Sequence, residues 1–170
     1  MNATQPLWSP DPAKTGDTRI SAFIDCVNHQ FNIQLDDYEA LYRWSVENKE
    51  SFWSTLWDFG GVIGEKGNRV LIKGDNIEKA EWFPDATLNF AENLLRRQDD
   101  ATALFFQAED MVSYNLSYRT LYHQVANVAD WLQKNGLQAG DRVAAYMPNM
   151  PETVVAMLAA TSAPRSVLLP

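Results

Sequence analysis

The stretch SYRTLYHQVANVADWLQKNGLQAGDRVAAYMPNMPETVVAMLAA, residues 117–160, decides the fold that this chain can adopt. Its first part carries apolar residues at helical spacing, which form one stripe: Tyr118, Leu121, Tyr122, Val125, Val128, Ala129 and Leu132. Ser117 is a suitable N-cap, and Gly136 is a suitable C-terminal stop. The pattern therefore predicts a long amphipathic helix between these two residues.

A strand and a second helix are predicted beyond Gly136. Residues 143–147 are apolar on both faces, as in a strand that is buried between layers of helices. Pro148 ends this strand, Pro151 suits a first helical position, and residues 153–160 continue as an almost wholly apolar helix. Helix, turn, buried strand and helix are part of an open α/β sheet. Because the chain ends shortly afterwards, we expect an incomplete sheet, the front of a larger α/β domain.

The composition predicts a soluble cytoplasmic protein. Hydrophobic residues make up 46% of the chain, enough for one domain core, and 22 acidic against 14 basic residues give a net charge of −8. With this charge and no basic stripe, we expect neither nucleic acid nor membrane as a partner. No secretory signal is visible, and the apolar runs are too short to cross a bilayer. A lone Cys26 excludes an internal disulfide and fits a reducing compartment.

Three short amphipathic helices are predicted near the N-terminus. Asp17 or Thr18 caps the first, which carries apolar residues up to Phe31 on one side. The second starts after Asp37, and the third, over residues 52–57, stops at a pair of glycines. These helices are rich in tryptophan and tyrosine, and they are too small to bury all their rings without a larger body to pack on.

The middle of the chain is predicted to hold connectors and short elements. Residues 60–67 are rich in glycine but lack both a final Lys-Ser/Thr and GxGxxG spacing, so we interpret them as a plain connector. Pro84 and Asp85 mark a turn. The other elements that we expect are a strand at 69–72, a helix at 88–95 that is closed by Arg96 and Arg97, and a hairpin of strands at 103–106 and 111–116.

The chemically reactive residues form no recognisable site. His29 and His123 lie far apart in the sequence, with no Cys or carboxylate at metal-ligand spacing, so ordinary histidines are predicted. Cys26 adjoins an apolar helical stripe and is predicted to be a small, partly buried side chain. Caps or turns explain the acidic pairs, which are Asp36–Asp37, Asp99–Asp100 and Glu109–Asp110. The chain also lacks a GxSxG elbow and a Walker-type loop, so we expect no catalytic, cofactor-binding or metal-binding residue within it.

The sequence nevertheless carries a family resemblance. Residues 136–160, with the strand-to-helix entry LSYRTL at 116–121, resemble the N-terminal domain of adenylate-forming acyl-CoA synthetases. The segment WFPDATLNFAEN at 82–93 is similar to the branch of acetyl-, propionyl- and acetoacetyl-CoA synthetases. Within this branch, three short motifs most resemble the acetoacetyl-CoA synthetases: Trp8-Ser-Pro, Tyr42-Arg-Trp-Ser-Val46 and Ser51-Phe-Trp53. The resemblance covers roughly residues 7–162.

The resemblance implies a two-step ligase. In that family a small carboxylate, for this branch acetoacetate, attacks the α-phosphate of ATP, giving an acyl-adenylate and diphosphate, and the thiol of CoA then displaces AMP. Mg²⁺ balances the charge of the phosphates. The family supplies its phosphate loop, its other nucleotide-binding motifs and a catalytic lysine from segments beyond the part that this chain covers. The resemblance therefore implies a truncated acetoacetate–CoA ligase, which binds no ATP, Mg²⁺ or CoA and is inactive alone.

Two other interpretations remain open. One is a fragment of an acetyl- or propionyl-CoA synthetase. The other is a non-catalytic interaction module, in which the exposed apolar sheet surface of residues 143–147 and 154–160 associates with another chain.

The resemblance also divides the chain into four parts. They are a flexible arm at 1–16, a helical acyl-CoA-synthetase N-terminal region at 17–97, the first α/β portion of the AMP-binding domain at 98–162 and an aberrant tail at 163–170. The tail reads Ala-Pro-Arg-Ser-Val-Leu-Leu-Pro, where the family continues with Gly-Ala-Val and small residues such as Ser-Ser. One codon choice for the tail, preceded by a G and regrouped by one base, translates as Gly-Ala-Ala-Val-Cys-Ser-Ser-Ser, close to the family pattern. We therefore hypothesise a frameshift near codons 162–163.

This hypothesis predicts the sequence of the gene downstream of codon 162. Sequencing is expected to find, one base out of register, a continuous reading frame that encodes the phosphate loop of the family. A downstream region without such a frame would contradict the hypothesis.

Overall fold

A computed structural model describes residues 8, 11, 15–109 and 112–162 of the chain. The chain divides into two compact units: Met1–Val62 with Val70–Trp82, and Ile63–Arg69 with Phe83–Pro170. Most of the arm predicted at 1–16 and all of the tail at 163–170 lie outside the described residues. None of the helices in the described ranges combines the length and the apolar character needed to cross a bilayer.

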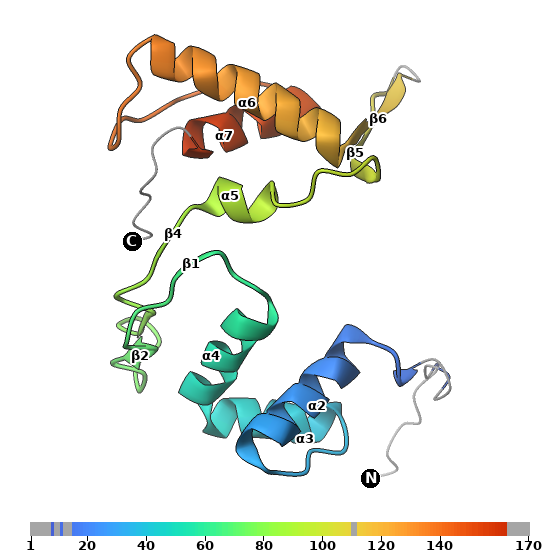
Figure 1. Cartoon of the computed structure of the whole chain (residues 1–170), viewed down its shortest axis with the longest axis vertical. Helices are drawn as coiled ribbons and strands as arrows, with labels where there is room; N and C mark the ends of the chain where they lie inside the picture. Colours follow the sequence, from blue (N-terminus) through green and yellow to red (C-terminus); the bar gives the residue numbers. More distant parts are fainter. Residues whose placement is uncertain (1–7, 9–10, 12–14, 110–111, 163–170) are drawn as a thin grey trace. The chain divides into compact units, whose positions relative to one another are not determined.

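Three helices make up most of the first unit (Figure 1): α2 (Arg19–Phe31), α3 (Tyr38–Glu47) and α4 (Lys49–Phe59). Polar side chains start two of them, as predicted. The N–H of Ser21 donates to Oγ1 of Thr18 at 3.3 Å, and the N–H of Ala40 donates to the carboxylate of Asp37 at 2.8 Å. The third helix ends at Gly60, and so all three predicted helices are confirmed.

Phenylalanine rings build the core of the first unit. Phe23, Val27 and Leu41 are buried. The ring of Phe23 meets the rings of Phe52 and Phe59 nearly edge-on, with centroids 5.7 and 5.1 Å apart. A short antiparallel pair, β2 (Leu71–Ile72) with β3 (Glu81–Trp82), completes this unit. Several aromatic side chains stay exposed, in keeping with the small size of the helices: Tyr38, Tyr42, Trp53 and Trp82.

The second unit combines two antiparallel strand pairs with three helices. The pairs are β1 (Gly64–Glu65) with β4 (Thr87–Leu88) and β5 (Thr102–Gln107) with β6 (Ser113–Ser117), and the helices are α5 (Phe90–Leu94), α6 (Tyr118–Lys134) and α7 (Pro151–Ser162). The predicted hairpin is confirmed, although residues 110 and 111 at its tip are not described. The N–H of Thr120 donates to Oγ of Ser117 at 3.1 Å, and Gly136 follows α6 with a φ of 94°. Both predicted ends of this helix are therefore confirmed.

The helix predicted at 88–95 starts later than expected. Leu88 belongs to β4, where it pairs with Gly64. Asn89 then caps α5, because its Oδ1 accepts a hydrogen bond from the N–H of Glu92 at 3.0 Å. The periodicity alone did not reveal that strand pairing claims the first position of the apolar stripe.

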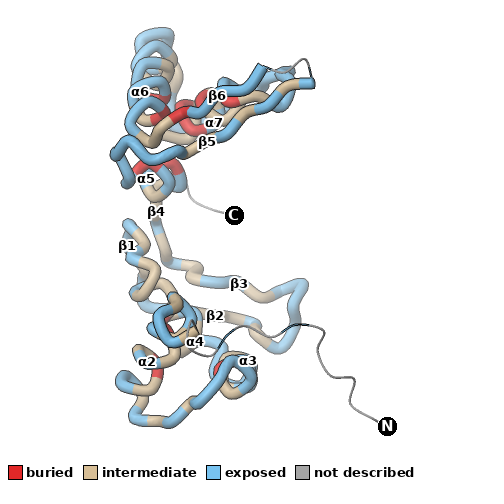
Figure 2. The backbone as a smooth tube through the Cα atoms, turned by 90° about the vertical axis from the view of Figure 1, so that its right-hand side faces the viewer, coloured by how far each residue is buried: buried red, intermediate tan, exposed pale blue. Residues whose placement is uncertain are grey.

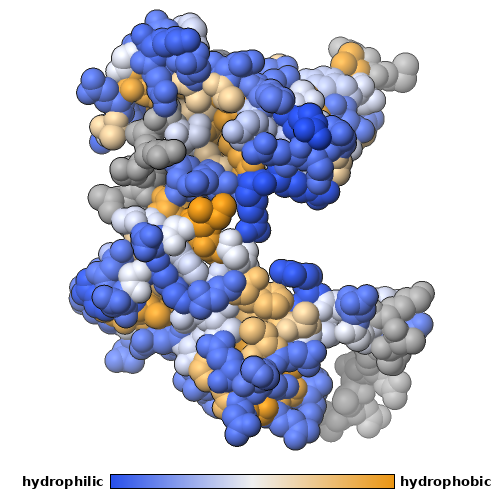
Figure 3. Space-filling view, viewed as in Figure 1, coloured by the Kyte–Doolittle hydropathy of each residue, from blue (hydrophilic) through white to orange (hydrophobic). Residues whose placement is uncertain are grey.

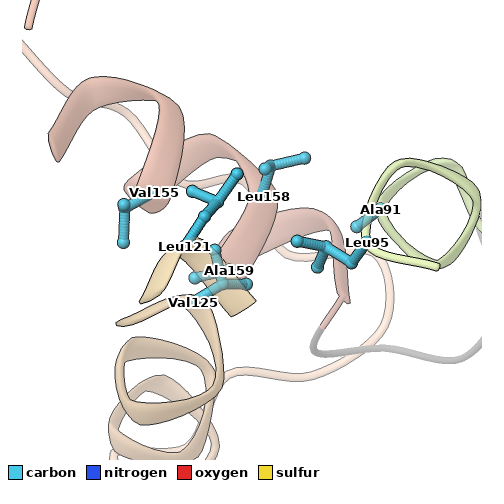
Figure 4. Packing of buried hydrophobic residues seen from close by; sticks show 7 residues of the cluster. All are labelled: Ala91, Leu95, Leu121, Val125, Val155, Leu158 and Ala159. Atoms are coloured by element: carbon cyan, nitrogen blue, oxygen red, sulfur yellow. The ribbon is translucent and has the colours of Figure 1, made fainter. Parts of the chain in front are cut away.

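The core of the second unit lies where α5, α6 and α7 meet (Figure 4). Its buried residues are Ala91, Leu95, Leu121, Val125, Val155, Leu158 and Ala159. On α7 they recur three and four positions apart, so they share one face of the helix. Figure 2 shows buried residues of this unit along the three helices and at one place in β6, and Leu95, which directly follows α5, is buried as well. The hairpin adds partly buried side chains at Ala103 and Leu104.

The prediction of a strand at residues 143–147 is wrong. These residues have no regular secondary structure and are exposed, and Tyr146 is fully so. A buried strand needs hydrogen-bonded neighbours for its backbone N–H and C=O groups. Within the described ranges the only sheets are three antiparallel pairs of other strands, so residues 143–147 have no strand to pair with. The buried open sheet predicted around them is accordingly not formed.

Because α7 packs against α6 through one face, substitutions at two neighbouring residues of α7 are predicted to change the free energy of unfolding by very different amounts. Leu158 is 2% exposed in the core, whereas Met157 is 47% exposed. Leu158→Ala is expected to lower the free energy of unfolding by about 2–5 kcal/mol, because it removes buried apolar surface and leaves a cavity. Met157→Ala, the matched control, is expected to change it by less than about 1 kcal/mol. Urea unfolding followed by circular dichroism measures both; equal losses would show that α7 does not pack as described.

Candidate functional site

The reactive residues considered from the sequence lie apart from one another. His29 on α2 and His123 on α6 are both exposed and belong to different units, and Cys26 is partly buried. Asp36 and Asp37 lie at the start of α3, where Asp37 is the cap. In the part of the chain that the structure describes, no three His, Cys, Asp or Glu side chains gather closely enough to hold a metal ion.

The acidic pair Asp99 and Asp100 is held by two arginines. Nε of Arg97 donates to Asp99 at 2.6 Å, and Nε of Arg119 donates to Asp100 at 2.8 Å. These hydrogen bonds hold the pKa of both carboxyl groups below the ordinary value. A general acid at neutral pH needs a raised pKa. The pair therefore connects the approach to β5 with the first turn of α6 and is unsuited to acid catalysis.

A polar cluster lies where residues 67–69, at the end of the glycine-rich loop, meet the turn at residues 83–86. The N–H of Ala86 donates to the carbonyl of Phe83 at 2.9 Å, which confirms the predicted turn. Both ends of the Arg69 guanidinium donate to the carboxylate of Asp85, with Nε to Oδ2 at 2.8 Å. This pairing lowers the pKa of Asp85. Gly67 lies against the same turn.

Two asparagines extend the cluster to α5 and α7. Oδ1 of Asn93 accepts from the N–H of Ile63 at 2.8 Å, and its Nδ2 donates to the carbonyl of Ile63 at 2.8 Å. Nδ2 of Asn89 donates to the carbonyl of Thr161 near the end of α7, at 3.0 Å. The side-chain amides of Asn89 and Asn93 thus bind backbone groups, whereas Asp85 binds a side chain. The two amides fasten the loop and the end of α7 around α5.

The sequence did not predict these roles for Arg69, Asn89 and Asn93. A usable signal was present, because two asparagines four residues apart lie on one face of a short helix that follows a turn. Their partners could not be read in the same way, since Ile63 is thirty residues away from Asn93.

The glycine-rich loop is a connector, as predicted. It contains the strand β1, which pairs with β4, whereas a phosphate-binding loop leads from a strand into a helix N-terminus. Within the described residues, this loop therefore lacks the strand-to-helix setting of a phosphate-binding loop.

Two known protein families match parts of this chain. Residues 38–94 match the family described as "Acetyl-coenzyme A synthetase N-terminus", and residues 90–165 match "AMP-binding enzyme". An acetoacetyl-coenzyme A synthetase of Rhizobium meliloti (strain 1021) is 44% identical over 162 residues, which are 95% of this chain and 25% of that protein. The chain is a homologue of the acetoacetyl-CoA synthetases. It spans about a quarter of the length of the curated relatives that it matches.

The structural comparison agrees with this homology. The solved acetoacetyl-CoA synthetase from Streptomyces lividans superimposes with a TM-score of 0.80 at 36% identity, covering 94% of this chain and 25% of that one. The α/β fold is thus that of the corresponding part of an adenylate-forming enzyme, as the resemblance implied. An acetyl-coenzyme A synthetase of Marinobacter nauticus is also similar, at 35% identity, but over 75% of this chain.

The tight packing at Gly67 predicts that alanine lowers the free energy of unfolding more at this position than at Gly140. Gly67 has a φ of 75°, and a Cβ there would lie 2.5 Å from Cβ of Asp85. Gly140 has a φ of 93°, with nothing within 4 Å of its Cβ position. Alanine at either site costs about 1–2 kcal/mol of backbone strain, and Gly67→Ala adds overpacking of about 1–3 kcal/mol. Urea unfolding is expected to rank Gly67→Ala as clearly the less stable; the reverse order would contradict the packing of loop on turn.

Proposed function

We propose that this chain is the N-terminal part of a cytoplasmic acetoacetate–CoA ligase, and that the 170 residues alone do not carry out the reaction. The observation that supports this most is the match at 44% identity across 95% of the chain to a synthetase four times as long. The whole reaction joins acetoacetate to CoA through an acyl-adenylate, with ATP and Mg²⁺. We assign that reaction to the full-length relatives and the structural frame of their N-terminal part to this chain.

The roles of the polar residues support the second half of the proposal. Adenylate formation needs donors and cations that are directed at the phosphates. In the described residues, the side chains of the motif at 82–93 that make hydrogen bonds direct them to the chain itself: Asp85 binds Arg69, Asn89 holds α7, and Asn93 holds the loop. The catalytic, nucleotide-binding and metal-binding residues are accordingly proposed to lie elsewhere in a complete ligase.

The extent of the matches favours acetoacetate over acetate or propionate as the acid. Acetoacetyl-CoA synthetases match 95% and 92% of the chain, whereas the acetyl-CoA synthetase matches 75%. We also propose that residues 17–97 form the N-terminal region of the ligase and that residues 98–162 open its AMP-binding domain. The boundary between the two family matches, at residues 90–94, supports this division.

One observation favours a second function, that of a non-catalytic interaction module. Residues 143–147 are apolar and exposed, and their backbone has no strand partner among the described residues. Such a segment can pair with a strand of another chain. Val143, Tyr146 and Met147 would then supply the apolar contact.

Exchange of labelled diphosphate into ATP tests the proposed function. With acetoacetate and Mg²⁺, the purified chain is expected to give no labelled ATP above background, because the proposal places the phosphate-binding groups elsewhere in the complete ligase. A full-length acetoacetyl-CoA synthetase, as the control, is expected to give rapid exchange. Turnover by the 170-residue chain would overturn the proposal.

Size-exclusion chromatography of the same preparation separates the two functions. A complex of defined size that dissociates when Tyr146→Ser is introduced would favour the interaction module. A monomer, or an aggregate that is unaffected by this substitution, would leave the ligase part as the better description.

A further inference from the structure

A groove with an aromatic lining lies between the three helices of the first unit. It has a volume of 420 Å³, and its rings are Phe23, Tyr38, Tyr42, Phe52 and Phe59. Both tyrosines are more than half exposed. Figure 3 shows hydrophobic side chains gathered at the surface of this helical unit. An open apolar hollow of this kind on a small unit marks a place where another segment binds.

Two contacts link residues that line the groove. Tyr38 and Tyr42 lie one turn apart on α3, with their rings stacked at a centroid distance of 6.5 Å. On the opposite side the guanidinium of Arg19 lies 4.7 Å from the centre of the Phe59 ring. Aromatic rings from all three helices suit an extended ligand, such as a proline-rich segment in the polyproline II conformation.

The chain itself carries such a segment. Residues 6–12 read Pro-Leu-Trp-Ser-Pro-Asp-Pro, three prolines around one tryptophan. Trp8 is 77% exposed, which leaves a large apolar side chain in water. A ligand of this composition has little conformational entropy to lose on docking, and the ring of Trp8 supplies the apolar area that an anchor needs.

The attachment of this segment lies beside the groove. Oγ of Ser21 donates to the carbonyl of Thr15 at 2.7 Å, and Oγ1 of Thr18 donates to the same carbonyl at 3.0 Å. These bonds fix the point where the arm leaves α2. The groove begins at Arg19 and Ile20, in the first turn of the same helix. Trp8 lies seven positions before Thr15, a stretch that spans up to about 22 Å in an extended form.

We propose that residues 6–12 of this chain occupy the aromatic groove of the same molecule, with Trp8 as the anchor between the tyrosines and the phenylalanines. The arm thereby covers apolar rings that the three helices are too few to bury. This role is independent of ligase activity, because every residue that it uses belongs to the first unit.

Cross-linking of paired cysteines in the full-length chain tests the proposal. In a Cys26→Ser background, Ser9→Cys next to the anchor is combined with Ser45→Cys in the lining of the groove. The matched control combines Ser9→Cys with Asp25→Cys, which is exposed on the side of α2 away from Ile20 and Phe23. With a short bismaleimide, the groove pair is expected to cross-link within one chain at least tenfold faster than the control. Adding Trp8→Gly is expected to reduce the rate to that of the control, and circular dichroism checks that each variant keeps its helices.

Equal rates for the two pairs in folded variants would overturn the proposal. So would a fast reaction that yields only cross-linked dimers, since the occupant would then be a second copy. A groove pair whose rate is unchanged by Trp8→Gly would overturn the role of Trp8 as the anchor.

Discussion

The packing of α7 against α6 is the contact on which the second unit depends. Leu158 and Ala159 of α7 meet Leu121 and Val125 of α6, and α5 joins the same core through Ala91 and Leu95. The contact fixes the two ends of residues 135–150, which have no regular secondary structure of their own. It also brings the end of α7 to Asn89, so that the same core positions the glycine-rich loop through α5. Burial of a few aliphatic side chains thus positions the hydrogen bonds of Asn89 and Asn93.

The availability of partner strands for backbone hydrogen bonds determines which strands form in this chain. Each short strand in the described ranges finds one antiparallel neighbour. Residues 143–147 have the composition of a strand covered on both faces, yet they find none. A parallel sheet needs its neighbouring strands and helices together, because an exposed, unpaired strand gains too little to offset its ordering entropy. The packing of the helices therefore maintains the fold of this chain. In an open α/β domain a larger sheet would carry the ligand site, and that sheet is absent from the described residues.

The helices could be predicted from the sequence because the signals that start and stop them are local. Thr18, Asp37 and Ser117 each bind an N–H three residues away, and apolar spacing gave the buried faces of α2 and α6. The strand at 143–147 was predicted wrongly. Its apolar composition is typical of a strand between neighbouring strands, and the local pattern does not show whether such neighbours are present. The cluster around Arg69, Asp85 and Asn93 was missed for the same reason: its hydrogen bonds join residues sixteen and thirty positions apart. Family resemblance singled out the segment at 82–93, and the structure gave its side chains their roles.

Hydrogen exchange of the backbone amides, read by mass spectrometry on the 170-residue chain, tests the central claim most directly. The claim is that the helical core forms without the sheet that residues 143–147 belong to. It predicts that amides of α6 and α7 exchange at least about a hundredfold more slowly than those of an unfolded peptide, since they open only with the core. Amides of residues 143–147 are predicted to exchange at the unfolded rate. Protection of 143–147 equal to that of α6, or an α7 that exchanges freely, would contradict the claim.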